Sequence, residues 1–313
     1  MAVVAVVGAG LIGASWCALL TWKGHAVRIV DPSPDVTARV TAMQDRAWAA
    51  LAGLEPPPAA PGAWQVMPLA EAVAGADLII EAGPEALEAK QALLADIDAA
   101  AAPAVPIASS TTAHPPSALQ APCRHPERVL VAHPFNPPHL VPLVEIVPSP
   151  RTDPAVTAAV RAFFEGLGKR CILVKKEATG HVANRLAAAL YREAVHLVAE
   201  GIADVEDVDA AIAYGPGLRW AVMGPHMLYH LGGGAGGLRA YLDHLGPAQE
   251  RRWADLGTPA LSEPVKQALV AGVEAEAAGR ALPALEAERD AALVAVLKAL
   301  AAVRGTGGGG GGG

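Results

Sequence analysis

Three glycines near the N-terminus constrain the fold of this chain more than any other feature. An apolar, β-branched run, Val3 to Val7, precedes them and predicts a strand buried on both faces. The glycines follow in G-x-G-x-x-G spacing, as Gly8, Gly10 and Gly13. Glycine in this pattern permits a tight turn, a close approach of the backbone to a pyrophosphate, and a close contact between a helix and a strand. The run from Ala14 to Trp22 is compatible with that helix.

An acidic residue follows at the distance that a dinucleotide site requires. The apolar run Ala26 to Val30 predicts a second strand and is followed by Asp31, eighteen residues after Gly13. A carboxylate at this place accepts hydrogen bonds from the adenosine ribose hydroxyls and repels a 2′-phosphate. The N-terminus of the intervening helix, with Leu11 and Ile12, presents N–H groups to the phosphates. We therefore predict an NAD site formed by the three glycines, Leu11, Ile12 and Asp31.

The composition argues against several classes of protein. The chain has 313 residues, enough for two domains, and a net charge of −7, which argues against a nucleic-acid or anionic-membrane partner. It contains no run of eighteen apolar residues, and the apolar N-terminus lacks the basic region of a signal peptide. The three cysteines, Cys17, Cys123 and Cys171, are not spaced as in a disulfide framework or a zinc site, which indicates a reducing cytoplasm. His226 and His230 have no acidic or cysteine partner nearby, so we predict no metal.

The order of the predicted elements divides the chain. Over residues 1–178 strands alternate with helices, which indicates an α/β fold with a Rossmann-type, doubly wound parallel sheet. The further strands expected there are 76–81, 106–109, 128–132 and 141–147, with helices at 35–54, 69–73 and 84–100. Over residues 179–304 helical runs dominate and predict an all-α C-terminal domain, with helices at 182–200, 205–214, 237–245, 263–278 and 285–303. The glycines of 305–313 predict a disordered tail.

Two polar residues stand out among the later predicted strands. His133 directly follows the strand 128–132, and Glu145 lies twelve residues later inside an apolar strand, where a carboxylate needs a partner to offset its desolvation. As a pair they suit a dehydrogenase, because the imidazole takes a hydroxyl proton as hydride leaves carbon and the carboxylate stabilises the imidazolium. The alternative is that His133 caps a strand and Glu145 pairs with a structural arginine. Spacing alone leaves both interpretations open.

Several segments, in order and over about residues 1 to 250, resemble the L-3-hydroxyacyl-CoA dehydrogenase family. They are Gly8 to Asp31, the segment around Thr112, His133-Pro134-Phe135-Asn136-Pro137, Leu143-Val144-Glu145-Ile146-Val147, Gly180-His181-Val182-Ala183-Asn184-Arg185-Leu186 and residues 215–225. The resemblance implies an NAD-binding Rossmann domain followed by a helical domain that contributes to the substrate site and dimerises. It also implies an oxidoreductase that interconverts a CH–OH group and a ketone.

The resemblance implies roles for individual residues. The family's catalytic pair falls on His133 and Glu145, and its asparagine that hydrogen-bonds the substrate oxygen falls on Asn184. The family's catalytic serine falls on Thr112, which keeps the hydroxyl but adds a methyl that narrows the pocket and stiffens χ1. A second departure is His181, where the family usually has Phe.

Two cofactor contacts also come from the resemblance. The family's acid and lysine near the nicotinamide and its ribose fall on Glu85 and Lys90, five residues apart. Periodicity places Lys90 on the polar face of the helix expected over 84–100, together with Glu88 and Gln91.

The substrate branch is indicated by Leu218-Arg219-Trp220-Ala221 and by residues 232–237. These are more similar to the family's free-acid members, which act on carnitine- or gulonate-like acids and include λ-crystallin. An arginine at the cleft binds a free carboxylate bidentately, and Trp220 offers a face to a quaternary ammonium. We therefore expect Arg219 and Trp220 to contact a small 3-hydroxy acid. The alternative is that Arg219 ties the helical domain together and Trp220 packs in its core.

Two other functions remain open. One is a short-chain L-3-hydroxyacyl-CoA dehydrogenase, for which the basic residues Lys169, Arg170, Lys175 and Lys176 are the candidate cluster for the CoA phosphates. The other is a non-catalytic crystallin-like or nucleotide-sensing protein, which would not need the full Thr/His/Glu/Asn set. From the resemblance we expect a homodimer, formed through the helical domain, and from the cysteines a cytoplasmic location.

Overall fold

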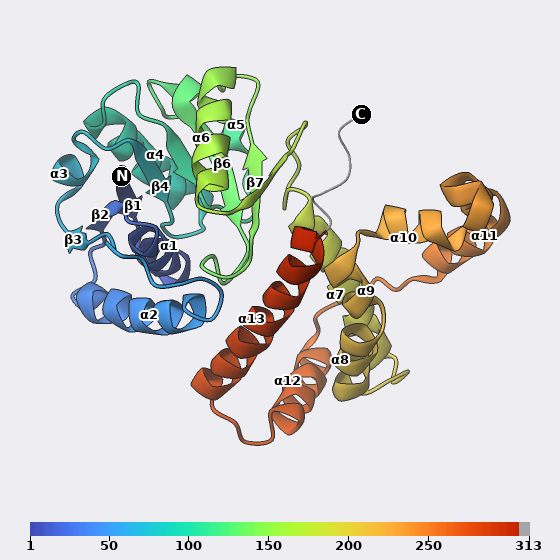
Figure 1. The fold of residues 1–313 in the computed structure, drawn as a ribbon. Helices are drawn as coiled ribbons and strands as arrows, with labels where there is room; N and C mark the ends of the chain where they lie inside the picture. The colour runs from blue at the N-terminus through green and yellow to red at the C-terminus, as the bar shows by residue number, and fades with distance from the viewer. Residues whose placement is uncertain (307–313) are drawn as a thin grey trace. The chain divides into compact units, whose positions relative to one another are not determined.

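The structure, a computed structural model, describes residues 1–306 (Figure 1). The chain divides into two compact units. Unit 1 comprises residues 1–185 and 290–299, and unit 2 comprises residues 186–289 and those from 300 onward. The glycine tail predicted at the C-terminus lies, from residue 307, outside the described residues.

Unit 1 is built on an eight-stranded sheet in the order β3-β2-β1-β4-β5-β6-β7-β8. The strands are β1 Val3–Val7, β2 Ala26–Val30, β3 Trp64–Val66, β4 Leu78–Glu81, β5 Ile107–Ser109, β6 Val129–Pro134, β7 Leu143–Val147 and β8 Arg170–Leu173. All neighbours are parallel except β6 and β7. The strand order changes direction between β1 and β4, and in such sheets ligands bind beyond the carboxyl ends of the strands at this point.

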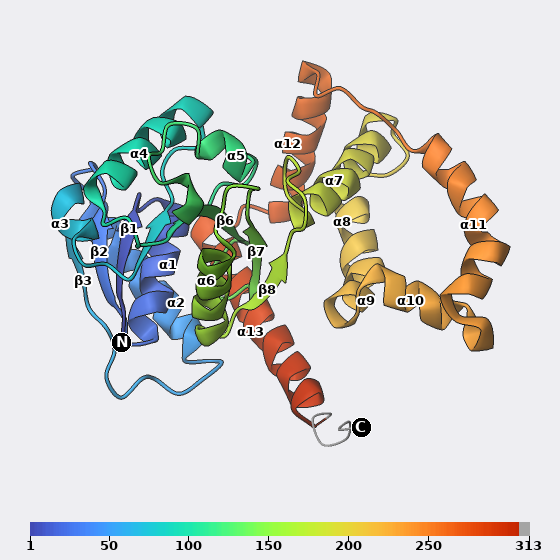
Figure 2. The same cartoon turned by 90° about the horizontal axis from the view of Figure 1, so that it is seen from above.

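Helices cover both faces of the sheet (Figure 2). On β1, Val4 and Val6 belong to one apolar cluster and Ala5 and Val7 to another. The first cluster includes residues of α1 (Leu11–Trp22), α2 (Val36–Leu51) and α6 (Pro154–Gly166). The second includes residues of α3 (Leu69–Val73), α4 (Leu87–Ala100) and α5 (Pro116–Leu119). Burial on both faces is why the first strand is continuously apolar instead of alternating.

The predicted α/β fold is confirmed, with one departure from a wholly parallel sheet. Strand β7 runs antiparallel to β6 because only residues 135–142 connect them, with no helix between. A parallel connection needs a crossover of about a dozen residues or more. The antiparallel pairing places residues of β6 and β7 directly opposite each other, which matters for the site. Two strands were not predicted from the sequence: β3, which is only three residues long, and β8, of which only Cys171 is buried.

Unit 2 is helical, as predicted. Most of its residues belong to α7 Ala183–Ala199, α8 Val205–Tyr214, α9 Pro216–Val222, α10 Pro225–Gly232, α11 Gly237–Asp255, α12 Glu263–Ala277 and α13 Leu282–Thr306. Two of these helices are shared, because the first residues of α7 and residues 290–299 of α13 belong to unit 1. The helices α9 and α10 were not predicted, because glycine is frequent in and around them. Each begins with a proline directly after a glycine, and proline suits the first position of a helix since its φ is already helical.

Candidate active site

The glycine-rich turn between β1 and α1 has the geometry of a dinucleotide cradle. Gly8 has a φ of +94°, and a Cβ there would lie 2.5 Å from the carbonyl oxygen of Ala82. A Cβ on Gly13 would lie 1.9 Å from the carbonyl oxygen of Gly8. A Cβ on Gly10, by contrast, would meet nothing within 4 Å. The protein's own packing therefore requires glycine at Gly8 and Gly13, whereas the space at Gly10 is left for a ligand.

A cavity of about 600 Å³ opens over this turn. It is lined by Val7, Gly8, Gly10, Val30, Asp31, Pro32, Ser33, Arg39, Ala82, Gly83, Pro84, Ala89 and Leu93. Leu11 and Ile12 form the first turn of α1, whose N-terminus has no side-chain cap. Uncapped N–H groups with the positive end of a helix dipole suit the phosphates of a dinucleotide. The residues present fit that group.

Asp31 lines this cavity and is held there by three polar contacts. Its Oδ2 accepts a hydrogen bond from the Ala9 N–H at 2.7 Å, and its Oδ1 accepts one from the Ser33 N–H at 2.9 Å. The Arg39 Nη2 lies 3.2 Å from Oδ1. Asp31 has the position expected for a ribose-binding carboxylate, and Ser33 and Arg39 are cavity residues that the sequence analysis did not identify.

His133 and Glu145 form a buried hydrogen-bonded pair. They lie opposite each other in the antiparallel register of β6 and β7, and His133 Nδ1 is 2.7 Å from Glu145 Oε2. His133 is 2% exposed and Glu145 is fully buried. A carboxylate accepts only, so Nδ1 carries the proton and Nε2 of the neutral ring is the free base. The alternative of a structural arginine as the partner of Glu145 is wrong.

The remaining oxygen of Glu145 is also satisfied. Oε1 accepts hydrogen bonds from the N–H groups of Val182 and Ala183, each at 2.9 Å. Burial alone would raise the pKa of Glu145. The hydrogen bonds from His133 and the two N–H groups outweigh burial and hold the pKa below its ordinary value. Glu145 is therefore ionised at neutral pH.

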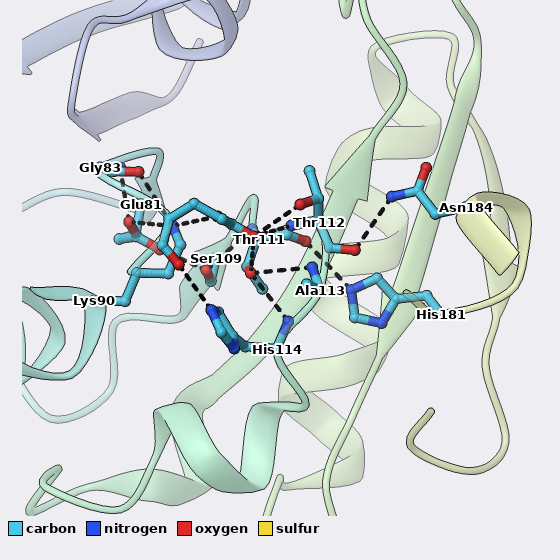
Figure 3. Close-up of polar contacts among 11 residues, drawn as sticks. Glu81, Gly83, Lys90, Ser109, Thr111, Thr112, Ala113, His114, His181 and Asn184 are labelled. Atoms are coloured by element: carbon cyan, nitrogen blue, oxygen red, sulfur yellow. Dashed lines mark hydrogen bonds and ion pairs between the residues drawn. The ribbon is translucent and has the colours of Figure 1, made fainter. Parts of the chain in front are cut away.

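Glu85 is the centre of a second polar cluster, whose members Thr111, Thr112, His114 and Lys90 are labelled in Figure 3. Its Oε1 accepts hydrogen bonds from the Thr111 hydroxyl at 2.7 Å and from both the N–H and the hydroxyl of Thr112 at 2.8 Å. The backbone oxygen of Glu85 lies 2.7 Å from His114 Nε2. Burial raises the pKa of Glu85, but the hydrogen bonds from the two threonine hydroxyls and the charge of Lys90 outweigh burial. The pKa is therefore below its ordinary value, and the carboxylate is ionised.

Periodicity predicted that Lys90 lies on the polar face of its helix, and this prediction is wrong. It is 1% exposed, and its Nζ lies 3.0 Å from Glu81 Oε1 and 3.3 Å from Glu85 Oε2. A buried ammonium requires such partners, and Glu81 at the end of β4 supplies a fully buried carboxylate. The ion pair turns this residue of α4 inward. Glu81 and Ser109, which also hydrogen-bonds Glu81, were not assigned to the site.

Asn184 connects the two clusters. Its Nδ2 donates to the Thr112 carbonyl oxygen at 3.2 Å (Figure 3). The same Nδ2 lies 3.5 Å from His133 Nε2. Thus His133, Glu145, Thr112, Asn184, Glu85 and Lys90, predicted from widely separated segments, lie together in unit 1.

His181 lies beside the catalytic candidates. It has a φ of +52°, is 1% exposed, and has its ring centroid 5.4 Å from that of His133. Its Nε2 lies 3.3 Å from the carbonyl oxygen of Thr111, while Nδ1 has no hydrogen-bond partner among the described residues. Burial and the nearby His133 lower the pKa of His181, so this ring is neutral.

Arg219 and Trp220 lie on α9 in unit 2, and both side chains are exposed. Neither is packed in a core, which argues against the structural alternative. Their contact with a substrate remains a prediction.

The basic cluster considered for CoA phosphates loses one member. Lys169 is 8% exposed, and its Nζ donates to the backbone oxygens of Pro138 and Val141 in the loop between β6 and β7. Burial and the charge of Lys23 lower the pKa of Lys169 to about 7. The Lys169 side chain is thus buried and hydrogen-bonded to the loop, which makes it a poor partner for a CoA phosphate.

Residues 1–306 contain neither a candidate metal site nor a candidate membrane-spanning helix. No group of three or more His, Cys, Asp or Glu side chains there could hold a metal ion. No helix in the same residues has the length and apolarity to cross a membrane.

The chain matches two family domains that together cover most of its length. Residues 3–178 match the NAD-binding domain of 3-hydroxyacyl-CoA dehydrogenase, and residues 180–262 match its C-terminal domain. Among solved structures, the chain is similar to 5-formyl-3-hydroxy-2-methylpyridine 4-carboxylic acid 5-dehydrogenase, an NAD⁺-dependent dismutase. The TM-score is 0.80 at 30% identity, covering 96% of this chain and 99% of that chain.

Curated relatives are more similar in sequence. L-carnitine dehydrogenase of Streptomyces coelicolor is 44% identical over 298 residues, which cover 95% of this chain and 94% of the relative. L-carnitine dehydrogenase of Pseudomonas aeruginosa is 42% identical, with 95% and 93% covered. The chain therefore belongs to the 3-hydroxyacyl-CoA dehydrogenase family and is an NAD-dependent dehydrogenase that acts on a CH–OH group.

Proposed function

We propose that this protein oxidises the 3-hydroxyl group of L-carnitine, a free 3-hydroxy acid, to the 3-keto form with NAD⁺. The observation that carries the proposal is 44% identity, over 95% of the chain, to a relative named L-carnitine dehydrogenase. The buried, hydrogen-bonded His133–Glu145 pair supports the chemistry.

His133 is the general base in this proposal. Its Nδ1 is held by Glu145, so Nε2 takes the proton of the substrate hydroxyl as the C–H bond breaks. Bound NAD⁺ would supply the hydride acceptor for this reaction. Glu145 stabilises the imidazolium that forms, because its charge is buried beside it. The proton then leaves His133 for solvent, and the ketone and NADH are the products.

Asn184 and Thr112 complete the site around the reacting oxygen. Asn184 Nδ2, 3.5 Å from His133 Nε2, donates to the substrate oxygen and orients it toward the base. The Thr112 hydroxyl donates a hydrogen bond to Glu85, so its oxygen is held in one orientation at the edge of the site. Glu85 and Lys90 bind near the nicotinamide ribose, while the three glycines, Leu11, Ile12 and Asp31 hold the remainder of the cofactor.

Two side chains of α9 account for substrate choice. Arg219 binds the free carboxylate and Trp220 faces the quaternary ammonium of carnitine. Both are exposed and thus available to a ligand. A CoA thioester lacks the carboxylate that such an arginine requires.

The test is NADH formation with a panel of L-carnitine, L-gulonate, L-3-hydroxybutyrate and L-3-hydroxybutyryl-CoA. Each is assayed with the wild type, with Arg219→Met, and with Arg239→Met, an exposed arginine on α11 of the same unit. Activity on L-carnitine that is lost in Arg219→Met but kept in Arg239→Met supports the proposal. Activity on the thioester alone, indifferent to Arg219, overturns it in favour of the acyl-CoA function.

We also infer a cytoplasmic homodimer. The support is the set of exposed apolar side chains on the helices of unit 2, such as Leu186, Tyr191 and Tyr214, and the three unpaired cysteines. Light scattering of the purified protein tests the dimer: a monomer mass at all concentrations contradicts it.

A further inference from the structure

An arginine lies where the adenosine ribose of the cofactor is expected. Arg39, on α2, lines the 600 Å³ cavity together with Asp31 and Ser33. Its Nε donates to the Ala9 carbonyl oxygen at 2.8 Å, and its Nη2 lies 3.2 Å from Asp31 Oδ1. The Arg39 side chain is 35% exposed and that of Asp31 is 11% exposed. A cation is therefore already present at the ribose end of a site that prefers NAD.

The Asp31 carboxylate gathers the donors that a phosphate would use. It accepts hydrogen bonds from the N–H groups of Ala9 and Ser33, and it pairs with the Arg39 guanidinium. Backbone N–H groups and an arginine are the usual partners of a phosphate oxygen. The Asp31 carboxylate thus occupies a site whose donors suit a phosphate, and its negative charge repels a second anion.

A second carboxylate restrains Arg39. Asp35 Oδ1 lies 3.4 Å from Arg39 Nη1 and accepts a hydrogen bond from the Ser33 hydroxyl. The Ser33 hydroxyl, together with Arg39, lowers the pKa of Asp35, so this carboxylate is also charged. It is exposed, so water and salt screen it more than Asp31.

We propose that Arg39 and the Ser33 N–H form a subsite for the 2′-phosphate of NADP, which Asp31 occupies in the wild-type protein. The preference for NAD then rests on the Asp31 carboxylate and not on the lack of a cation. Removing that carboxylate frees charge-assisted hydrogen bonds for the phosphate, each worth roughly 10- to 150-fold in affinity.

The experiment measures the Kd of NAD⁺ and of NADP⁺ by calorimetry, without substrate, so it is independent of the proposed carnitine activity. Wild type is compared with Asp31→Ser, Arg39→Met and the double variant Asp31→Ser/Arg39→Met. Asp45→Ser, an exposed carboxylate on α2, changes the net charge equally and serves as the control.

Asp31→Ser is expected to bind NADP⁺ about 10-fold or more tighter than wild type and NAD⁺ more weakly. The double variant should lose that gain, and Asp31→Ser/Arg39→Lys should keep part of it because the charge remains. Asp45→Ser should bind both cofactors as wild type does.

Two results overturn the proposal. One is NADP⁺ affinity in the double variant equal to that of Asp31→Ser, which would exclude Arg39. The other is no gain of NADP⁺ affinity in a folded Asp31 variant. Asp31→Asn, which retains an acceptor for the Ala9 N–H, is measured in parallel in case Asp31→Ser does not fold.

Discussion

His133 and Glu145 face each other across β6 and β7, with Nδ1 and Oε2 only 2.7 Å apart and both side chains buried. The other Glu145 oxygen is held by two backbone N–H groups at the start of the segment that carries Asn184. One carboxylate thus fixes the tautomer of His133, the proposed base, and holds the start of the segment that carries Asn184, the proposed partner of the substrate oxygen.

Replacing either member of this pair should impair catalysis without impairing cofactor binding. We expect His133→Gln and Glu145→Gln each to lower kcat by about 10²-fold or more, because the proton acceptor is lost or loses its orientation and charge partner. Steady-state kinetics with NAD⁺ and calorimetric NAD⁺ binding check this. Glu165→Gln, an exposed carboxylate on α6, is the matched control. A kcat near that of wild type in Glu145→Gln would exclude the orienting role.

Thr112 should tolerate only a hydroxyl-bearing replacement. Its hydroxyl donates to the ionised Glu85, a charge-assisted hydrogen bond worth about 1.5–3 kcal/mol. Thr112→Ser keeps this bond, so we expect kcat/KM close to wild type. Thr112→Val keeps the shape but not the bond, and kcat/KM should fall about 10-fold or more. Equal kinetics of the two variants would show that the hydroxyl has no role.

The buried pair of Glu81 and Lys90 should respond asymmetrically to substitution. Lys90→Met leaves the buried Glu81 carboxylate without its cation and should lower the free energy of unfolding by about 3–5 kcal/mol. Adding Glu81→Leu should recover part of that loss, since no buried charge then remains. Urea unfolding of the cofactor-free single and double variants measures both effects. Additive losses in the double variant would contradict the ion-pair explanation.

His181 should make folding stability depend on pH. Burial and His133 lower its pKa below 6.5. Just below that pH the histidine is protonated in the unfolded chain but remains neutral in the folded protein. Stability is therefore full above pH 6.5 and falls as the pH drops below it, by up to about 1.4 kcal/mol per pH unit.

We expect His181→Phe to reduce this pH dependence. The measurement is the free energy of unfolding over about one pH unit on the acid side of 6.5, in wild type and variant. His244→Phe, which replaces an exposed histidine of unit 2, is the control and should keep the wild-type slope. An unchanged slope in His181→Phe would assign the acid sensitivity to other groups.

Local sequence was sufficient to predict the strand, the glycine turn and the helix that begin the chain. These elements are contiguous, and the backbone geometry of the turn requires glycine at Gly8, which has a positive φ, and at Gly13, which packs against Gly8. The strand–helix alternation likewise predicted the sheet, because its period follows from which faces are buried. The short β3 and β8, and the proline-initiated α9 and α10, carry patterns too weak to be recognised without their neighbours.

The arrangement of the proposed catalytic residues depended on tertiary structure. Spacing left the pairing of His133 and Glu145 open, and the antiparallel register of β6 and β7 decided it, because it places the two residues opposite each other. Helical periodicity put Lys90 in solvent, whereas the buried Glu81 on a different element turned it inward. Likewise, Arg39 reaches Asp31 and Ala9 only because α2 packs beside the glycine turn. Backbone turns are determined by adjacent residues, but the partner of a buried charge comes from whichever distant element packs against it, and that only the folded chain decides.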